Sequence, residues 1–272
     1  MLATSTIWIK KNHIKVRLLK KQEVSLRKVK LLHMLFKKHL FIVCSLLLFY
    51  ACKQELKTTF SEINITTETN KLVEVNIPKA IGGNTISNTI NSEINNLVIN
   101  ALEVGEPNNS TSKSIEESIN AFNEEYDAFN KDFPDSAMLW EAQIDGEILF
   151  ESPEIISISI TSYLNTGGAH GNTVITFLNF DAQTGKRLQN TDLIKNDAGF
   201  KTLAASYFKK NLKDEDMLFK PDSFQLPENM GYVEDGIHLL YNTYEIAPYA
   251  MGIIEFTIPF EKVRPFLVFN GA

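Results

Sequence analysis

The sequence predicts an α+β fold, in which an antiparallel sheet with hairpins packs against a few helices and the body is divided into two small modules. Three observations support this prediction. Apolar residues follow helical spacing between residues 86 and 133, and alternate with a period of two from residue 138 onward. The 272-residue chain is 44% hydrophobic and 22% charged, so it has enough apolar side chains for a core.

Charge divides the chain at Cys52. Eleven lysines and arginines and one acidic residue precede Cys52, whereas 16 basic and 32 acidic residues follow from there, which gives the body a net charge of −16. Such asymmetry is typical of a targeting segment joined to a cargo. Because an acidic body repels phosphate backbones, the charge argues against nucleic-acid binding as the main function.

Residues 34–51 are predicted to be a lipoprotein signal peptide. Lys37 and Lys38 precede 12 uncharged residues that end at Ala51. As a helix this run is about 18 Å long, too short for the ~30 Å hydrocarbon layer of a membrane. The small residue before Cys52 resembles the lipobox of bacterial lipoproteins, which implies that Cys52 carries the lipid, palmitate or a similar acyl chain. The alternative is an ordinary buried cysteine after a cleaved signal.

The segments around the signal have simpler interpretations. Residues 1–33 carry nine lysines and arginines, and are either a mis-called extension upstream of a true start at Met34 or a basic cytoplasmic tail. Residues 52–69 are polar and predicted to form a tether. Cys44 lies within the signal, so the mature body has no second cysteine for a disulfide or a thiolate metal site.

The predicted elements begin with a strand over 72–77 that ends at Pro78. Two helices follow. The second begins with Ser114 and Glu117, which have the spacing of a capping box, and ends at Pro134. The apolar faces consist of Ile86, Ile90, Ile94, Leu97 and Ala101 in the first helix, and Ile115, Ile119, Phe122, Tyr126, Phe129 and Phe133 in the second.

From residue 138 the pattern predicts strands. Asp145-Gly146 is expected to form the tight turn of a hairpin. Residues 156–161 alternate isoleucine with serine or threonine, which predicts a strand with one solvated face. The remaining elements are a strand over 173–180, a turn at Thr184-Gly185, a helix capped by Asp197, a hairpin turning at Asp235-Gly236, a strand over 253–258 and a short terminal segment over 260–267.

Two residue clusters are candidate ligand-binding sites. The glycine-rich loop 167–172 is either a tight turn whose histidine bonds the backbone or a ligand-contact loop with that histidine as a polar anchor. Residues 241–252 hold three tyrosines, which suits sugar or protein recognition but also suits a core-lining loop. The candidate ligand-binding residues are Gly167, Gly168, His170, Gly171, Asn172, Tyr244, Glu245 and Tyr249.

Catalytic motifs are absent from the sequence. The chain has no H-E-x-x-H pair, no G-x-S-x-G elbow and no Walker loop. A metal at His170 would need a carboxylate such as Asp181 or Glu245 beside it. We therefore predict no catalytic residue, no cofactor and no metal.

The two clusters and the residues around them resemble one known family. The residues that carry the resemblance are the loop 167–172 with Asn179-Phe180-Asp181 and Thr184-Gly185-Lys186, and the run 244–250 with Gly252, Phe256 and Ile258-Pro259. They resemble the extracytoplasmic domain of RsiV-type lysozyme-sensing anti-sigma factors, which also accompanies PdaC-type peptidoglycan deacetylases. The resemblance implies an RsiV-like carboxy-terminal domain over 150–272 and a PdaC-like module over 70–149.

In RsiV-like proteins this domain binds a lysozyme, whereas the chain shows no motif of an anti-sigma module or of a deacetylase catalytic domain with its metal ligands. We therefore expect a non-catalytic lipoprotein of the cell envelope, anchored to the membrane and facing outside the cytoplasm. Its expected partner is a peptidoglycan fragment or a lysozyme-like wall-lytic enzyme. An envelope carbohydrate hydrolase or deacetylase using His170 with a carboxylate is one alternative. A structural lipoprotein that holds partners through the helix at 114–133 is another.

Overall fold

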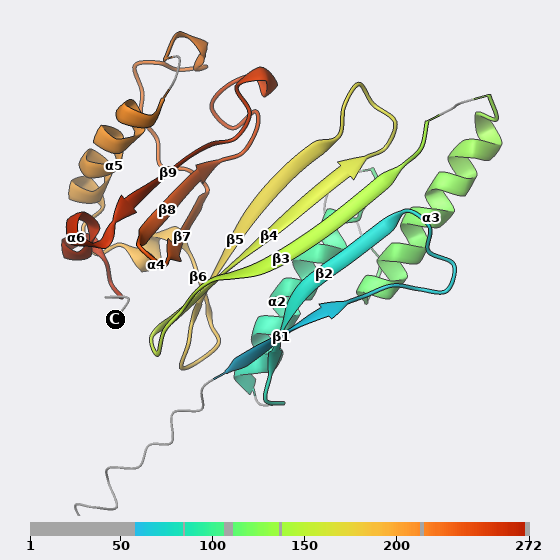
Figure 1. Cartoon of the computed structure of the whole chain (residues 1–272), viewed down its shortest axis with the longest axis horizontal. Helices are drawn as coiled ribbons and strands as arrows, with labels where there is room; N and C mark the ends of the chain where they lie inside the picture. The colour runs from blue at the N-terminus through green and yellow to red at the C-terminus, as the bar shows by residue number, and fades with distance from the viewer. Residues whose placement is uncertain (1–57, 84, 106–110, 136–137, 213–214, 270–272) are drawn as a thin grey trace, which may run out of the picture. The chain divides into compact units, whose positions relative to one another are not determined.

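The computed structural model describes residues 58–269 except 84, 106–110, 136–137 and 213–214. The predictions for residues 1–33, for the signal at 34–51 and for Cys52 lie outside these residues. The described chain forms a six-stranded and a three-stranded sheet with helices (Figure 1), which confirms the α+β prediction. None of the described helices has the length and hydropathy needed to cross a bilayer.

The strands of the larger sheet lie in chain order, and neighbouring strands are antiparallel except for one pair. They are β1 (Thr59–Asn64), β2 (Val73–Ile81), β3 (Glu141–Glu151), β4 (Ile155–Asn165), β5 (Asn172–Asp181) and β6 (Arg187–Leu188). The pair β2–β3 is parallel, with Val73 opposite Ala142. A parallel pair needs a crossover connection, and here α2 (Thr85–Ala101) and α3 (Ile115–Asp132) provide it.

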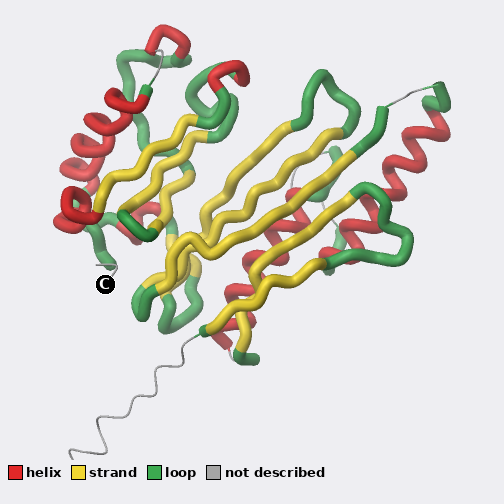
Figure 2. The backbone as a smooth tube through the Cα atoms, in the orientation of Figure 1, coloured by secondary structure: helices red, strands yellow, loops and turns green. Residues whose placement is uncertain are grey.

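Both crossover helices cover the same face of the larger sheet (Figure 2). Their apolar stripes pack on β2, β3 and β4, and Ile90, Ile94 and Phe122 are almost fully buried. Ser114 caps α3 as predicted, because its side chain accepts a hydrogen bond of 3.2 Å from the backbone N–H of Glu117. The helices thus form where the sequence pattern places them.

Two predictions for the first strands are wrong. The tether expected over 52–69 does not extend through residues 59–64, which form β1 and pair with residues 76–81 of β2. Phe60 and Ile63 pack against the core, so this segment gains burial by joining the sheet. β2 also continues past Pro78, because its pairing with β3 ends at Asn76 and the missing proline N–H interrupts no ladder there.

The hairpin expected at Asp145-Gly146 is wrong, because β3 runs through this dipeptide without turning. A Cβ atom at Gly146 would lie 2.6 Å from Cδ of Pro78 and 2.7 Å from Cδ1 of Ile160. The Asp145 carboxylate accepts a hydrogen bond of 3.2 Å from the Asn76 side chain. The glycine therefore permits close packing within the sheet, and the aspartate links two strands.

The smaller sheet contains β7 (Asn229–Val233), β8 (Gly236–Tyr241) and β9 (Ile254–Pro259), all antiparallel. The predicted hairpin at Asp235-Gly236 joins β7 to β8. The helix α5 (Asp197–Asn211) packs on this sheet and buries Phe200, Ala204 and Phe208; its N-cap is Asn196 and not the predicted Asp197. The remaining elements are short helices, of which those labelled η are 3₁₀ helices: α4 (Asn190–Leu193), η1 (Glu215–Met217), η2 (Tyr249–Met251), α6 (Phe260–Val263) and η3 (Arg264–Phe266).

A buried polar network joins the two sheets. The prediction that one face of β4 is solvated is wrong, because Ser157 is 0% and Ser159 is 5% exposed. The Ser157 hydroxyl donates to Oδ1 of Asn179 at 2.6 Å and accepts from the backbone N–H of Tyr232 at 3.1 Å. Asn179 donates to the carbonyl of Met230 at 2.8 Å. Ser157 is therefore polar because strand β7 lies against it and supplies the Tyr232 N–H as a hydrogen-bond donor, whereas the Ser159 hydroxyl bonds Glu147 on β3.

The boundary predicted between residues 149 and 150 lies within β3, and β4 and β5 share their core with α2 and α3. The division into two modules at this point remains a prediction.

Candidate functional site

The two predicted clusters meet in the folded chain. The ring of His170 stacks on the ring of Tyr249, with centroids 3.8 Å apart and planes inclined by 17°. The Tyr249 hydroxyl donates to the carbonyl of Gly171 at 3.3 Å, and the Thr243 hydroxyl donates to Oδ1 of Asn172 at 3.4 Å. We call residues 167–172 and 242–252 together the paired-loop surface.

Asn242 fastens the second loop to β5. Its side chain donates to the carbonyl of Ile175 at 2.8 Å and accepts from the N–H of the same residue at 2.9 Å. Strand β6 pairs only with Asn179 and Phe180 of β5, so β6 does not reach the backbone groups of Ile175 on this edge. Asn242 thus takes the place of a neighbouring strand and sets the position of the tyrosines that follow it.

Three rings are exposed together on the paired-loop surface. Tyr244 is 56% and Tyr249 is 37% exposed, their ring centroids are 5.7 Å apart, and His170 is also exposed. Tyr244 has φ of +67°, a conformation that strains a bulky residue by about 1–2 kcal/mol. A turn bond of 3.1 Å from the N–H of Glu245 to the carbonyl of Asn242 holds this conformation. The strained backbone conformation therefore occurs at a tyrosine whose side chain is exposed to solvent.

The glycines of the first loop differ in what they permit. Gly167 has φ of +86°, and a Cβ atom there would lie 2.7 Å from the sulfur of Met138. At Gly171 a Cβ atom would overlap the ring of Tyr163, so only glycine lets the loop lie on that ring. At Gly168 the nearest atom would be 3.7 Å away, so packing does not require glycine at that position.

Glu245 is bound to the backbone at both carboxylate oxygens. Oε1 accepts from the N–H of Glu228 and Oε2 from the N–H of Asn242, each at 2.9 Å. Burial raises the pKa of the Glu245 carboxyl, and the two backbone N–H groups oppose this shift. In this arrangement Glu245 holds the loop in place.

The raised pKa of Glu245 predicts a pH dependence of stability. The folded state binds this proton more tightly than the unfolded state, whose glutamate pKa is about 4.3. The resulting stabilisation is present below that value and is lost as pH rises through the folded pKa. Glu245→Gln removes the titration, so the unfolding free energy of the wild type minus that of the variant should fall with pH from about 4 upward.

Urea unfolding between about pH 3.5 and pH 7 measures this difference. Glu74→Gln, which replaces an exposed carboxylate on β2, serves as the control. A difference for Glu245→Gln that rises with pH, or that follows the control, would contradict the assignment.

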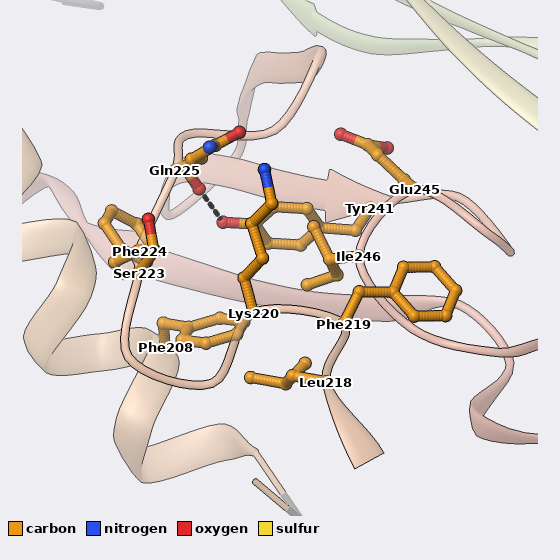
Figure 3. Close-up of a pocket in the computed structure, with 10 residues that line it drawn as sticks. All are labelled: Phe208, Leu218, Phe219, Lys220, Ser223, Phe224, Gln225, Tyr241, Glu245 and Ile246. Carbon is orange, nitrogen blue, oxygen red and sulfur yellow. Dashed lines mark hydrogen bonds between the residues drawn. The ribbon is translucent and has the colours of Figure 1, made fainter. Parts of the chain in front are cut away.

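A small pocket adjoins Glu245 in the carboxy-terminal part of the chain (Figure 3). Its volume is about 130 Å³. The Tyr241 hydroxyl donates to the carbonyl of Gln225 at 2.5 Å, and burial raises the pKa of Tyr241, so the hydroxyl stays protonated. The lining residues are Phe208, Leu218, Phe219, Lys220, Ser223, Phe224, Gln225, Tyr241, Glu245 and Ile246. Of these residues, Tyr241, Glu245 and Ile246 lie in the predicted cluster at 241–252.

The structure does not bring His170 together with a carboxylate. Asp181 accepts from the backbone N–H groups of Gln183 and Thr184 at 3.0 Å and 2.8 Å, and Glu245 has the backbone partners given above. In the described part of the chain the hydrogen-bond partner of the His170 ring is the Gly171 carbonyl, at 2.9 Å. No group of three or more histidine, cysteine or acidic side chains is placed to hold a metal among these residues.

Comparison with protein families gives two matches that together cover most of the described chain. Residues 65–173 match the model described as Deacetylase PdaC, and residues 191–261 match the model described as Protein of unknown function (DUF3298). The chain therefore has the PdaC-like plus DUF3298 architecture, which is the RsiV-type arrangement that the sequence motifs predict.

Individual relatives agree with this architecture. The chain is 30% identical over 121 residues to the peptidoglycan-N-acetylmuramic acid deacetylase PdaC of Bacillus subtilis (strain 168), a match that covers 41% of the chain and 26% of that protein. The chain thus spans about a quarter of the length of this relative.

Two solved structures show the same fold. A DUF3298 family member from Bacteroides fragilis NCTC 9343 has a TM-score of 0.57 at 23% identity, over 78% of this chain and 94% of that chain. A DUF3298 family protein from Pseudomonas aeruginosa PAO1 has a TM-score of 0.50 at 21% identity, over 79% and 94% of the two chains.

Proposed function

We propose that this protein is a lipid-anchored, non-catalytic binding protein of the cell envelope. Its proposed ligand is a peptidoglycan fragment or a lysozyme-like wall-lytic enzyme. The PdaC-like and DUF3298 domains point to an envelope function related to peptidoglycan. The observation that carries the proposal is the stacking of His170 on Tyr249, because it joins two loops 78 residues apart into one exposed surface.

The chemistry of the paired-loop surface suits recognition. Tyrosine and histidine rings offer apolar faces to a sugar ring or a protein side chain, and their polar atoms offer hydrogen bonds. Tyr244 and Tyr249 have few rotatable bonds, so holding them in place on binding costs little conformational entropy. The net charge of −16 on the body would also attract a cationic wall-lytic enzyme from a distance.

The pocket beside Glu245 offers a ligand a second contact area, which is small. Its volume of about 130 Å³ is below the roughly 300–1,000 Å³ typical of small-molecule sites. An apolar cavity of about 150 Å³ accommodates a benzene-sized group. The pocket therefore suits one ring or branched aliphatic side chain of a protein partner better than a whole glycan fragment.

Titration of the purified protein with a lysozyme and with soluble muropeptides tests the proposal. We expect saturable binding of at least one of the two. Absence of binding to both would contradict it, and the identity of the bound probe distinguishes a protein ligand from a wall fragment.

The alternative function, a hydrolase or deacetylase, needs a carboxylate beside His170. In the described chain the His170 ring is stacked on Tyr249 and bonded to a backbone carbonyl, which favours binding over catalysis. Turnover of peptidoglycan by the wild type that disappears in His170→Ala would support the alternative.

The proposed lipid anchor predicts that Cys52→Ser releases the protein from membranes. Cys52 carries the lipid in this proposal, and more than one acyl chain is expected because a single chain holds only weakly. Cell fractionation with a high-salt wash measures the effect. Cys44→Ser, which changes the other cysteine, should leave the protein in the membrane fraction. Equal membrane retention of Cys52→Ser and the wild type would refute the anchor.

A further inference from the structure

A second pocket lies between the end of α2 and the first half of α3, and has a volume of about 170 Å³. On α3, Ser118, Phe122 and Glu125 lie four and three residues apart and so share one face of the helix. Glu103 follows α2 and also lines the pocket. The lining residues are Ile99, Leu102, Glu103, Val104, Thr111, Ser112, Ser118, Ala121, Phe122 and Glu125.

Glu103 presents an acceptor that no residue of the described chain satisfies. Its Oε2 is buried and has no hydrogen-bond partner within the described structure. Buried polar atoms without a partner are rare in folded proteins, and a carboxylate oxygen in this position favours a bound donor. Glu125 supplies a second carboxylate, and none of the described lining residues is Lys, Arg or His.

We propose that this pocket binds a primary alkylammonium group. An ammonium has three donors, which suit the carboxylates of Glu103 and Glu125 and the hydroxyl of Ser118. Its apolar stem can pack on the apolar wall, which consists of Ile99, Leu102, Val104, Ala121 and Phe122. The site is separate from the paired-loop surface and does not depend on the function proposed for that surface.

The pocket fits an ammonium on a stem better than a bare metal ion. No group of three or more histidine, cysteine or acidic side chains is placed to hold a metal among the described residues, and the pocket lining combines its two carboxylates with apolar side chains. The volume of about 170 Å³ also leaves room for several methylene groups. The source of the ammonium is a lysine side chain of a polypeptide or a free amine.

Nuclear magnetic resonance titration of the purified protein with n-butylammonium chloride tests the site. We expect saturable shifts at the backbone amides of Glu103, Ser118 and Glu125. Glu103→Gln should weaken binding at least about tenfold, because it removes a charge-assisted contact, whereas Glu125→Gln should weaken it by a smaller factor because that side chain is exposed to solvent. Glu124→Gln, on the neighbouring position of α3 and outside the pocket lining, should bind as the wild type does.

Further probes define the source and the limits of the inference. Shifts with Nα-acetyl-lysine methylamide as well indicate a lysine side chain, and shifts with n-butylammonium alone indicate a free amine. The proposal is overturned if n-butanol shifts the same amides as strongly, if calcium binds there and butylammonium does not, or if no probe binds. Equal weakening by Glu124→Gln would show that the effect comes from the overall negative charge of the protein and not from the pocket. Unchanged circular dichroism of the variants excludes unfolding as the cause of weaker binding.

Discussion

Asn179→Ala should lower the free energy of unfolding by about 2–4 kcal/mol. Asn179 is 2% exposed and sits at the centre of the network between the two sheets. The substitution leaves the carbonyl of Met230 and the hydroxyl of Ser157 without their partner in a buried position, where an unmade hydrogen bond costs about 1–3 kcal/mol for each group. It also removes side-chain volume from a packed junction.

Urea unfolding of the wild type and of Asn179→Ala measures this loss of unfolding free energy. The comparison requires that the free energy fall with urea concentration at the same slope in both proteins. Asn64→Ala removes an exposed asparagine that bonds Asn76 on the neighbouring strand, and should change stability by about 0.5 kcal/mol or less. A loss in Asn179→Ala no larger than that of the control would show that the polar network does not hold the sheets together.

Tyr249→Ala should weaken binding of the envelope ligand at least about tenfold. The substitution removes a 37% exposed ring from the paired-loop surface, and also removes the stacking partner of His170. Tyr249→Phe keeps the ring and loses only the hydroxyl bond of 3.3 Å to Gly171, so its affinity should change by less than about threefold.

Isothermal titration with the ligand that binds the wild type measures both Tyr249 variants. Phe133→Ala removes an aromatic ring that is 59% exposed at the end of α3, outside the paired loops, and should bind as the wild type does. Wild-type affinity in Tyr249→Ala, or an equal loss in Phe133→Ala, would contradict the role assigned to Tyr249.

The sequence predicts the helices well because their signals are local. The stripes of α2 and α3 repeat over several turns, and the cap at Ser114 needs only a residue three positions away. The hairpin at Asp235-Gly236 is likewise a local signal that agrees with the packing around it.

The failed predictions concern residues whose meaning depends on distant contacts. Asp145-Gly146 has the composition of a turn, but Pro78 and Ile160 pack where a side chain would be. Ser157 has the polarity of a solvated position, but β7 covers it and supplies the backbone N–H of Tyr232. Such partners are set by the tertiary fold, and no short pattern reports them.

In the candidate site, too, features with a local sequence signal were predicted and features that depend on distant contacts were not. Aromatic and glycine content identified both loops of the paired-loop surface. The role of Asn242 was missed, since its two bonds to Ile175 depend on the free edge of β5. Lys220 and Phe224 were missed as well, because the segment at 218–225 carries no motif and acquires meaning only when it closes the pocket at Tyr241.

Hydrogen exchange of the purified protein, measured with and without the bound ligand, tests the central claim most directly. If residues 167–172 and 242–252 form the binding site, their amides should gain protection together and to a similar degree when the ligand binds. Protection of only one of these loops, or protection confined to other parts of the chain, would contradict the account.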